Sequence, residues 1–137
     1  MKKIVTLLLC VVLACAFLCG CGAKTKVLKE TDEFIIITPS EDFVGKTLKD
    51  CMDDLKTRGE LDYVINDGFV SSVNGIDTPA DYSYYWILYT DDAENSNDAW
   101  GKIEYDGKTY ASASLGASSL VISEGCIYIW VYTESTY

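Results

Sequence analysis

The stretch "YSYYWILYT" at residues 82–90 limits the folds open to this chain more than any other feature of the sequence. Successive side chains of a β-strand point to opposite faces of its sheet. One face of this strand would carry Tyr82, Tyr84, Trp86 and Leu88, and the other would carry Tyr85, Ile87 and Tyr89. A strand with one face in water alternates apolar with polar residues, and this one does not. We therefore expect both faces to be covered, by the chain's own loops, by a partner or by a ligand.

The last segment of the chain, "CIYIWVYT" at residues 126–133, shows the same property. Its aliphatic positions are Ile127, Ile129 and Val131, and its aromatic positions are Tyr128, Trp130 and Tyr132. A strand here would have one aliphatic and one aromatic face. We expect the aliphatic face to pack against a helix and the aromatic face to form a surface of rings with polar tips.

One helix and several strands are predicted for the rest of the chain. "TLKDCMDDLKTRG" at residues 47–59 has Thr47 as N-cap, Asp50 in a capping-box position and Gly59 after the last turn. Its apolar stripe comprises Leu48, Cys51 or Met52, and Leu55. Strands are predicted at 34–39, 61–65, 68–75, 82–90, 100–105, 108–113 and 126–133, with an Asp-Gly hairpin turn within 105–108. This pattern indicates an α+β fold, with one helix on a mostly antiparallel sheet.

The N-terminus resembles a bacterial lipoprotein signal. Two lysines precede the uncharged apolar run Ile4–Leu18, which is too short to span a membrane comfortably. The run ends in Leu18-Cys19-Gly20-Cys21, which resembles a lipobox with Cys21 as the lipidated residue. We expect residues 1–20 to be a signal peptide, 21–33 the lipidated cysteine and a polar tether, and 34–137 the folded domain. A plain secretory signal and an uncleaved anchor are the alternatives.

Charge narrows the set of partners. Loss of Lys2 and Lys3 with the signal would take the formal net charge from −10 to −12. A domain this acidic is a poor match for nucleic acid or for anionic lipid headgroups. The lipid anchor is therefore the membrane contact that we expect.

Two cysteines are left for disulfide or metal chemistry once the signal peptide is removed and Cys21 is lipidated. Cys51 and Cys126 remain in the domain, and the chain has no histidine, so a usual structural zinc site is excluded. Outside the cell these cysteines could form a disulfide. The alternative is that both are small buried side chains.

Enzymatic activity is not expected. The absence of histidine removes the usual general base and the histidine-containing triads, and no glycine-rich phosphate loop is found. The acidic stretch 91–99 places Asp92, Glu94, Ser96 and Asp98 at alternate positions, as calcium loops do. It has Asn97 where such loops require glycine, so a mobile, solvated loop without a metal is the better interpretation.

Four segments in order resemble a known family. They are "GKTLKDCMDDLK", "DGFVSSVNGIDTP", "SYYWILYT" and "ASSLVISEGCIYIWVYT". Together they are similar to the C-terminal domain of the vitamin B12 carriers transcobalamin and intrinsic factor, which also occurs in surface lipoproteins of Firmicutes. The resemblance covers about residues 34–133. Two features depart from the family: the long insertion between 90 and 108, and Cys126 where an acidic residue is more usual.

The resemblance implies a β-grasp-like fold without catalysis or a bound cofactor. In the animal carriers this domain covers one side of a corrinoid. Together with the lipobox, it implies an extracellular module, anchored by Cys21 to the outer face of the cytoplasmic membrane, that captures a small ligand such as cobalamin for a membrane transporter. A protein-interaction or adhesion module and a purely structural surface domain are the alternatives.

Four residues are predicted to contact the ligand. Tyr84, Trp86 and Trp130 would stack on it, and Asn74 in the "VNGI" turn would supply a polar contact. Exposure of the two tryptophans separates the hypotheses. A concave aromatic surface favours ligand binding, a flat exposed one favours a protein partner, and buried rings favour the structural alternative.

Overall fold

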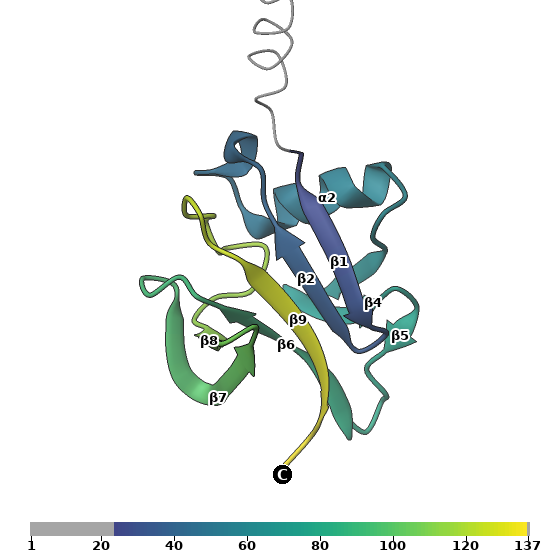
Figure 1. Cartoon of the computed structure of the whole chain (residues 1–137). Coiled ribbons are helices and arrows are strands. Elements are labelled where there is room, and N and C mark those ends of the chain that lie inside the picture. The colour runs from purple at the N-terminus through teal and green to yellow at the C-terminus, as the bar shows by residue number, and fades with distance from the viewer. Residues whose placement is uncertain (1–23, 137) are drawn as a thin grey trace, which may run out of the picture.

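The computed structural model describes residues 24–136 and contains two antiparallel sheets and a helix (Figure 1). The larger sheet has the strand order β1-β2-β9-β6-β8-β7. Its strands are β1 (Lys26–Thr31), β2 (Phe34–Thr38), β6 (Tyr84–Thr90), β7 (Ser96–Tyr105), β8 (Lys108–Ala113) and β9 (Tyr128–Glu134). The smaller sheet comprises β3 (Tyr63–Asn66), β4 (Phe69–Val73) and β5 (Ile76–Asp77). The predicted α+β class and the antiparallel pairing are confirmed.

Helix α2 (Leu48–Thr57) begins and ends where the sequence predicts. The hydroxyl of Thr47 accepts a hydrogen bond from the backbone of Asp50, whose carboxylate accepts one from the backbone of Thr47. This capping box satisfies two amides at a helix end that would otherwise lack partners. All four residues of the predicted stripe, Leu48, Cys51, Met52 and Leu55, are fully buried. A single-turn 3-10 helix, η1 (Glu41–Phe43), precedes α2.

Three hairpins turn through two-residue loops of the same kind. The loops are Asp67-Gly68 between β3 and β4, Asn74-Gly75 between β4 and β5, and Asp106-Gly107 between β7 and β8. Both residues of each loop have positive φ, as the type I′ turn requires, and Asx-Gly pairs adopt it at low cost. The third of these loops is the hairpin predicted from the sequence.

The helix packs on the aromatic face of the large sheet, and the prediction for this contact is therefore wrong. Buried residues of that face, which share one cluster with the helix stripe, are Ile35, Ile37, Trp86, Leu88, Tyr128 and Trp130. Register explains the composition, since Trp130 lies opposite both Ile35 of β2 and Leu88 of β6. Trp130 therefore packs beside an aliphatic neighbour on each side.

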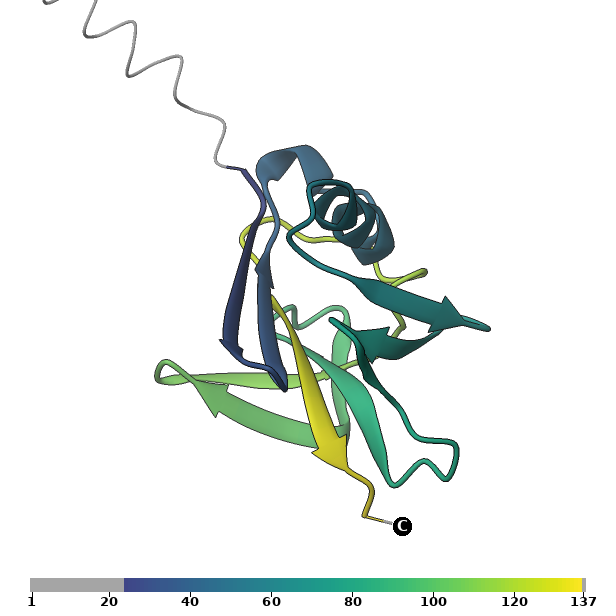
Figure 2. The same cartoon turned by 90° about the vertical axis from the view of Figure 1, so that its right-hand side faces the viewer.

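The chain's own β7–β8 hairpin covers the opposite face. A second core contains Ile36, Tyr89, Tyr110 and Ile129, with Phe34, Ile87, Ile103, Tyr105, Ile127 and Val131 packed around it. In Figure 2 the green β7–β8 hairpin runs across the direction of the yellow strand β9 rather than along it. Two separate cores thus cover the two faces of β6 from Trp86 to Tyr89, whereas Tyr82 and Tyr84 remain exposed.

The segment predicted to be a tether differs in part from the structure. Residues 26–31 form β1, which pairs with β2 along its length. Thr25 is buried, its hydroxyl accepts a hydrogen bond from the backbone of Ser40 at 3.0 Å, and its carbonyl oxygen accepts one from Arg58 at 2.8 Å. The described domain therefore begins before residue 26, not at residue 34. The signal peptide and Cys21 lie outside the described residues.

The acidic stretch 91–99 is more ordered than predicted. Residues from Ser96 onward belong to β7, whose pairing with β8 is interrupted by an irregularity between Asn97 and Lys102. Asp92 is buried, and its carboxylate accepts hydrogen bonds from Asn95 and Ser123. Its oxygens are thus used within the fold. Within residues 24–136 no cluster of potential metal ligands is found.

Cys51 and Cys126 are both free thiols, so the disulfide alternative is not what the structure shows. Cys51 is fully buried in the main core, and Cys126 packs against the same core while remaining partly exposed. Burial raises the pKa of the Cys51 thiol to about 11. In the part of the chain that the structure describes, no helix has the length and apolarity to cross a membrane.

Candidate functional site: a cleft between the two sheets

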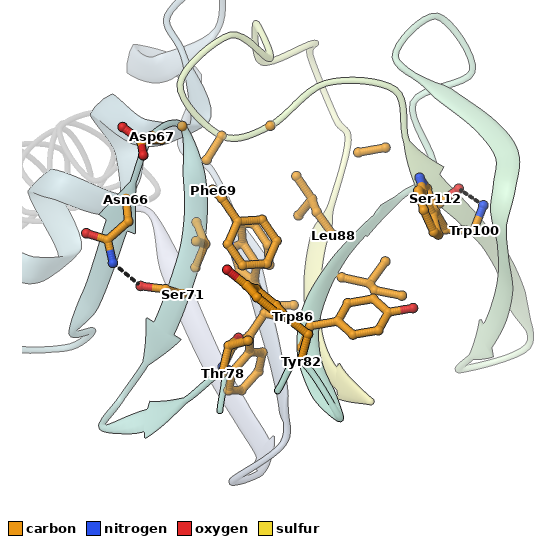
Figure 3. A pocket seen from close by; sticks show the side chains of 18 of the residues that line it. Asn66, Asp67, Phe69, Ser71, Thr78, Tyr82, Trp86, Leu88, Trp100 and Ser112 are labelled. Atoms are coloured by element: carbon orange, nitrogen blue, oxygen red, sulfur yellow. Dashed lines mark hydrogen bonds between the residues drawn. The ribbon is translucent and has the colours of Figure 1, made fainter. Parts of the chain in front are cut away.

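A cleft of about 790 Å³ opens where the small sheet meets the β6 side of the large one (Figure 3). The β3–β4 hairpin supplies one wall, the segment 78–82 and β6 a second, and β8 with the loop at 115–117 a third. Trp130 of β9 also lines it. Pockets that hold small ligands commonly measure about 300–1,000 Å³, so the cleft has a suitable size.

Three exposed aromatic rings line the cleft. Tyr82 is 63% exposed, Trp100 is 52% exposed and Phe69 is 40% exposed. In Figure 3 Phe69 and Tyr82 lie near the centre of the view, while Trp100 lies beside Ser112 at the right. Exposed apolar side chains that gather at one concave site mark binding surfaces more often than scattered ones do.

Local backbone geometry places each of these rings. Phe69 directly follows the Asp67-Gly68 turn, which turns the chain back into the cleft wall. Tyr82 has φ 55°, a left-handed conformation that is unusual for a bulky side chain. The backbone of Trp100 donates a hydrogen bond to the Ser112 hydroxyl at 3.1 Å, in the irregular part of β7. The turn thus places Phe69, the left-handed backbone places Tyr82, and the irregular part of β7 places Trp100.

Two buried tryptophans form the inner surface of the cleft. Trp86 is 2% exposed and Trp130 is 4% exposed, so both are also members of the main core. The indole nitrogen of Trp86 donates a hydrogen bond to the backbone carbonyl oxygen of Ile76. Because buried tryptophans favour a purely structural domain, these two rings do not support a binding role. The support for binding comes from the exposed rings of Phe69, Tyr82 and Trp100.

Two buried polar atoms in the lining have no hydrogen-bond partner. Among the described residues, the buried side-chain polar atoms without a partner are Oγ1 of Thr78 and Nε1 of Trp130. Both residues line the cleft. Buried polar groups are nearly always hydrogen-bonded, because leaving one unpaired costs about 1–3 kcal/mol. A bound molecule or ordered water would satisfy them.

The lining offers little charge. Asp67 is the one acidic residue among the residues that line the cleft, and none of these lining residues is basic. The remaining polar groups are uncharged amides and hydroxyls, including Asn66 bonded to Ser71 at 3.0 Å. Chemically the cleft can hold an apolar or aromatic molecule that is neutral or cationic.

The four residues predicted to bind a ligand are not brought together. Trp86 and Trp130 line the cleft, but Tyr84 lies outside the lining and stacks on Tyr132, with ring centroids 5.4 Å apart. Asn74 lies in its turn, where its side chain accepts a hydrogen bond from the backbone of Asp62 at 2.9 Å. Its carboxamide therefore has a role in holding the turn rather than in the cleft.

The exposed cleft rings were missed by sequence reasoning. Trp100 followed a stretch interpreted as a mobile loop, and Tyr82 was assigned only to a strand face. The signal that could have found Phe69 is the preceding Asp67-Gly68 pair, which has the same turn chemistry as the Asp-Gly hairpin recognised at 105–108.

Comparison with known proteins adds no relative. No protein-family model, no curated protein and no solved structure matches the chain.

Proposed function

We propose that this protein is an extracellular binding module, held at the outer face of the cytoplasmic membrane by a lipid on Cys21, whose cleft captures a small ligand. The observation that carries the proposal is the cleft itself, where exposed rings and unpartnered buried polar atoms occur together. Rings supply contact area at modest entropy cost, and a few polar groups fix orientation.

A corrinoid is the first ligand to test, because of the resemblance to the transcobalamin domain and its β-grasp-like fold. Such a ligand would be flat and largely uncharged, which suits an aromatic wall with little charge. An open cleft would cover one side of it, and delivery to a membrane transporter would follow. We propose in addition that the domain belongs to that family, has the β-grasp topology and does not catalyse a reaction.

Titration of a soluble fragment, residues 24–137, with cobalamin tests the ligand. Exposed Trp100 lies in the cleft, so binding should quench tryptophan fluorescence. Tyr82→Ala should weaken binding at least about tenfold by removing a ring contact. Tyr84→Ala is the matched control, since Tyr84 is an exposed tyrosine outside the lining. No quenching at high micromolar cobalamin would exclude the corrinoid.

The anchor is tested separately. Growth of the expressing bacterium with labelled palmitate should label the wild-type protein, and Cys21→Ser should abolish labelling and release the protein into the medium. Labelling that survives Cys21→Ser would contradict the assignment of Cys21.

A further inference from the structure

One wall of the cleft is the edge of a strand rather than its face. Four consecutive residues of β6, Tyr85, Trp86, Ile87 and Leu88, line the cleft. Side chains along a strand alternate between two faces, so a cavity over one face would contact every second residue. Contact with four residues in a row requires that the cleft borders the strand along its hydrogen-bonding edge.

Strand pairing identifies this edge as open. On one side β6 pairs with β9 along its full length, from Tyr84 to Thr90. On the other side it pairs with β8 only at Tyr89 and Thr90, beyond which β8 diverges. In the described part of the chain no strand pairs with 84–88 on that side.

Register shows which backbone groups the open edge presents. The backbone of Ser135 donates a hydrogen bond to the carbonyl oxygen of Ser83 at 2.7 Å, so these opposed residues form a hydrogen-bonded pair. Bonded and non-bonded pairs alternate along an antiparallel ladder. Tyr85 and Ile87 therefore direct their N–H and C=O groups toward β9. Trp86 and Leu88 direct theirs toward the cleft.

The edge also lacks the usual protection. Outer strands of sheets commonly carry lysines that discourage pairing with other chains. The outermost strand β1 carries Lys26 and Lys29, and β7 at the other end carries Lys102. The β6 edge has no charged residue between 84 and 88 and is flanked by the exposed rings of the cleft.

We propose that this edge docks an extended peptide segment of a partner protein, which adds a strand beside β6. Its backbone would pair with the N–H and C=O groups of Trp86 and Leu88, and alternate side chains would face the cleft rings. Because Asp67 is the charged residue of the lining and the chain is strongly acidic, the peptide is neutral or basic. This goes beyond small-ligand capture and does not depend on it.

Amide hydrogen exchange, followed residue by residue by NMR on the 24–137 fragment, tests the proposal. In the free protein the amides of Trp86 and Leu88 should exchange at least about a hundredfold faster than those of Tyr85 and Ile87, which bond to β9. The probe is a capped peptide about eight residues long, of alternating valine and threonine with a lysine at each end. Its addition should slow exchange at Trp86 and Leu88 at least about tenfold, with Tyr85 and Ile87 unchanged.

Two modified probes serve as controls. N-methylation of alternate peptide residues blocks the backbone hydrogen bonds and should weaken binding at least about tenfold. Glutamate in place of the end lysines should also weaken it, because Asp67 lies in the lining and the chain as a whole is acidic. Slow exchange of Trp86 and Leu88 in the free protein, or peptide binding that leaves them unchanged, would overturn the proposal.

Two further outcomes separate other occupants. Protection of Trp86 and Leu88 that grows with protein concentration, without peptide, would assign the edge to a second copy of this chain and overturn the peptide assignment. Failure of cobalamin to bind while the peptide protects these amides would reject the corrinoid and leave the strand-docking proposal standing.

Discussion

The indole nitrogen of Trp86 donates a hydrogen bond to the backbone carbonyl oxygen of Ile76 across 2.9 Å. Trp86 belongs to β6 of the large sheet and Ile76 to β5 of the small sheet, so this bond joins the two sheets directly. Trp86 also lines the cleft that opens between them. One residue of the candidate site therefore also connects the two sheets.

Trp86→Phe should destabilise the domain. The substitution removes the hydrogen bond to Ile76 and leaves a cavity in the main core, which together should lower the free energy of unfolding by about 2 kcal/mol or more. Urea denaturation followed by circular dichroism measures the change. Trp100→Phe is the matched control, because Trp100 is largely exposed and its loss should cost little. An equal loss in both variants would contradict the assigned role of Trp86.

Local sequence signals predicted the elements of the fold well. Thr47, Asp50 and Gly59 mark the ends of α2, and Asp106-Gly107 marks the β7–β8 turn, because capping and turn chemistry depend on neighbouring residues alone. Residues 26–31 were missed as a strand because their side chains are largely exposed, so no alternation marks them. Their pairing with β2 is a long-range backbone contact that the side-chain pattern does not report.

The candidate site was less accessible to sequence reasoning. Apolar character of both faces of 82–90 was predicted, but the segment that covers each face was not. The β7–β8 hairpin covers Ile129 and Tyr89. Its position depends on the point at which β8 diverges from β6, and this is a long-range feature that the side-chain pattern does not report. The same divergence opens the cleft, so neither the cleft nor the exposed role of Trp100 could be read from periodicity.

Thr25→Val should destabilise the domain and so test whether it begins before β1. Ser40 is buried, and its backbone donates a hydrogen bond to the Thr25 hydroxyl, which valine cannot accept. An unpaired buried donor costs about 1–3 kcal/mol, which chemical denaturation would resolve. Thr38→Val, at an exposed site of β2, should change stability by less than about 0.5 kcal/mol. A neutral Thr25→Val would indicate that the segment contributes nothing.

Asp92 should make stability depend on acid pH. Burial acts to raise the pKa of its carboxyl, but hydrogen bonds from Asn95, Ser123 and backbone amides outweigh it and lower the pKa below the ordinary 3.8. Because the folded-state pKa is the lower one, this stabilisation is present above 3.8 and is lost as the pH falls through the folded-state value.

The comparison of wild type with Asp92→Asn measures this dependence. Asparagine cannot reproduce an acceptor-only carboxylate, so the variant should be less stable at pH 7, and the difference should shrink as the pH falls below about 4. Thermal unfolding over a pH series gives both curves. Asp98→Asn is the control, since Asp98 is exposed and pairs with Lys102 at the surface. A difference that stays constant down to acid pH would refute the role of Asp92.

Thr78→Val should stabilise the protein, whereas the same substitution at Thr90 should destabilise it. The Thr78 hydroxyl oxygen is buried in the cleft wall without a hydrogen-bond partner in residues 24–136, so an isosteric methyl group removes an unpaired polar atom. The Thr90 hydroxyl donates to the carbonyl oxygen of Ile127 and accepts from the amide of Asp92, and both partners would be left unpaired. The expected changes in unfolding free energy are about +1 and about −2 kcal/mol.

The Thr78 result also bears on function, because a hydroxyl kept unpaired at a stability cost implies a use for it. If a bound molecule satisfies Oγ1, Thr78→Val should be more stable when free yet bind that molecule about three- to tenfold more weakly. Fluorescence titration of both proteins with cobalamin, beside their denaturation curves, measures the two effects together. Higher stability with unchanged affinity would place the Thr78 hydroxyl outside the ligand contacts, and lower stability would show that it has a partner within the fold.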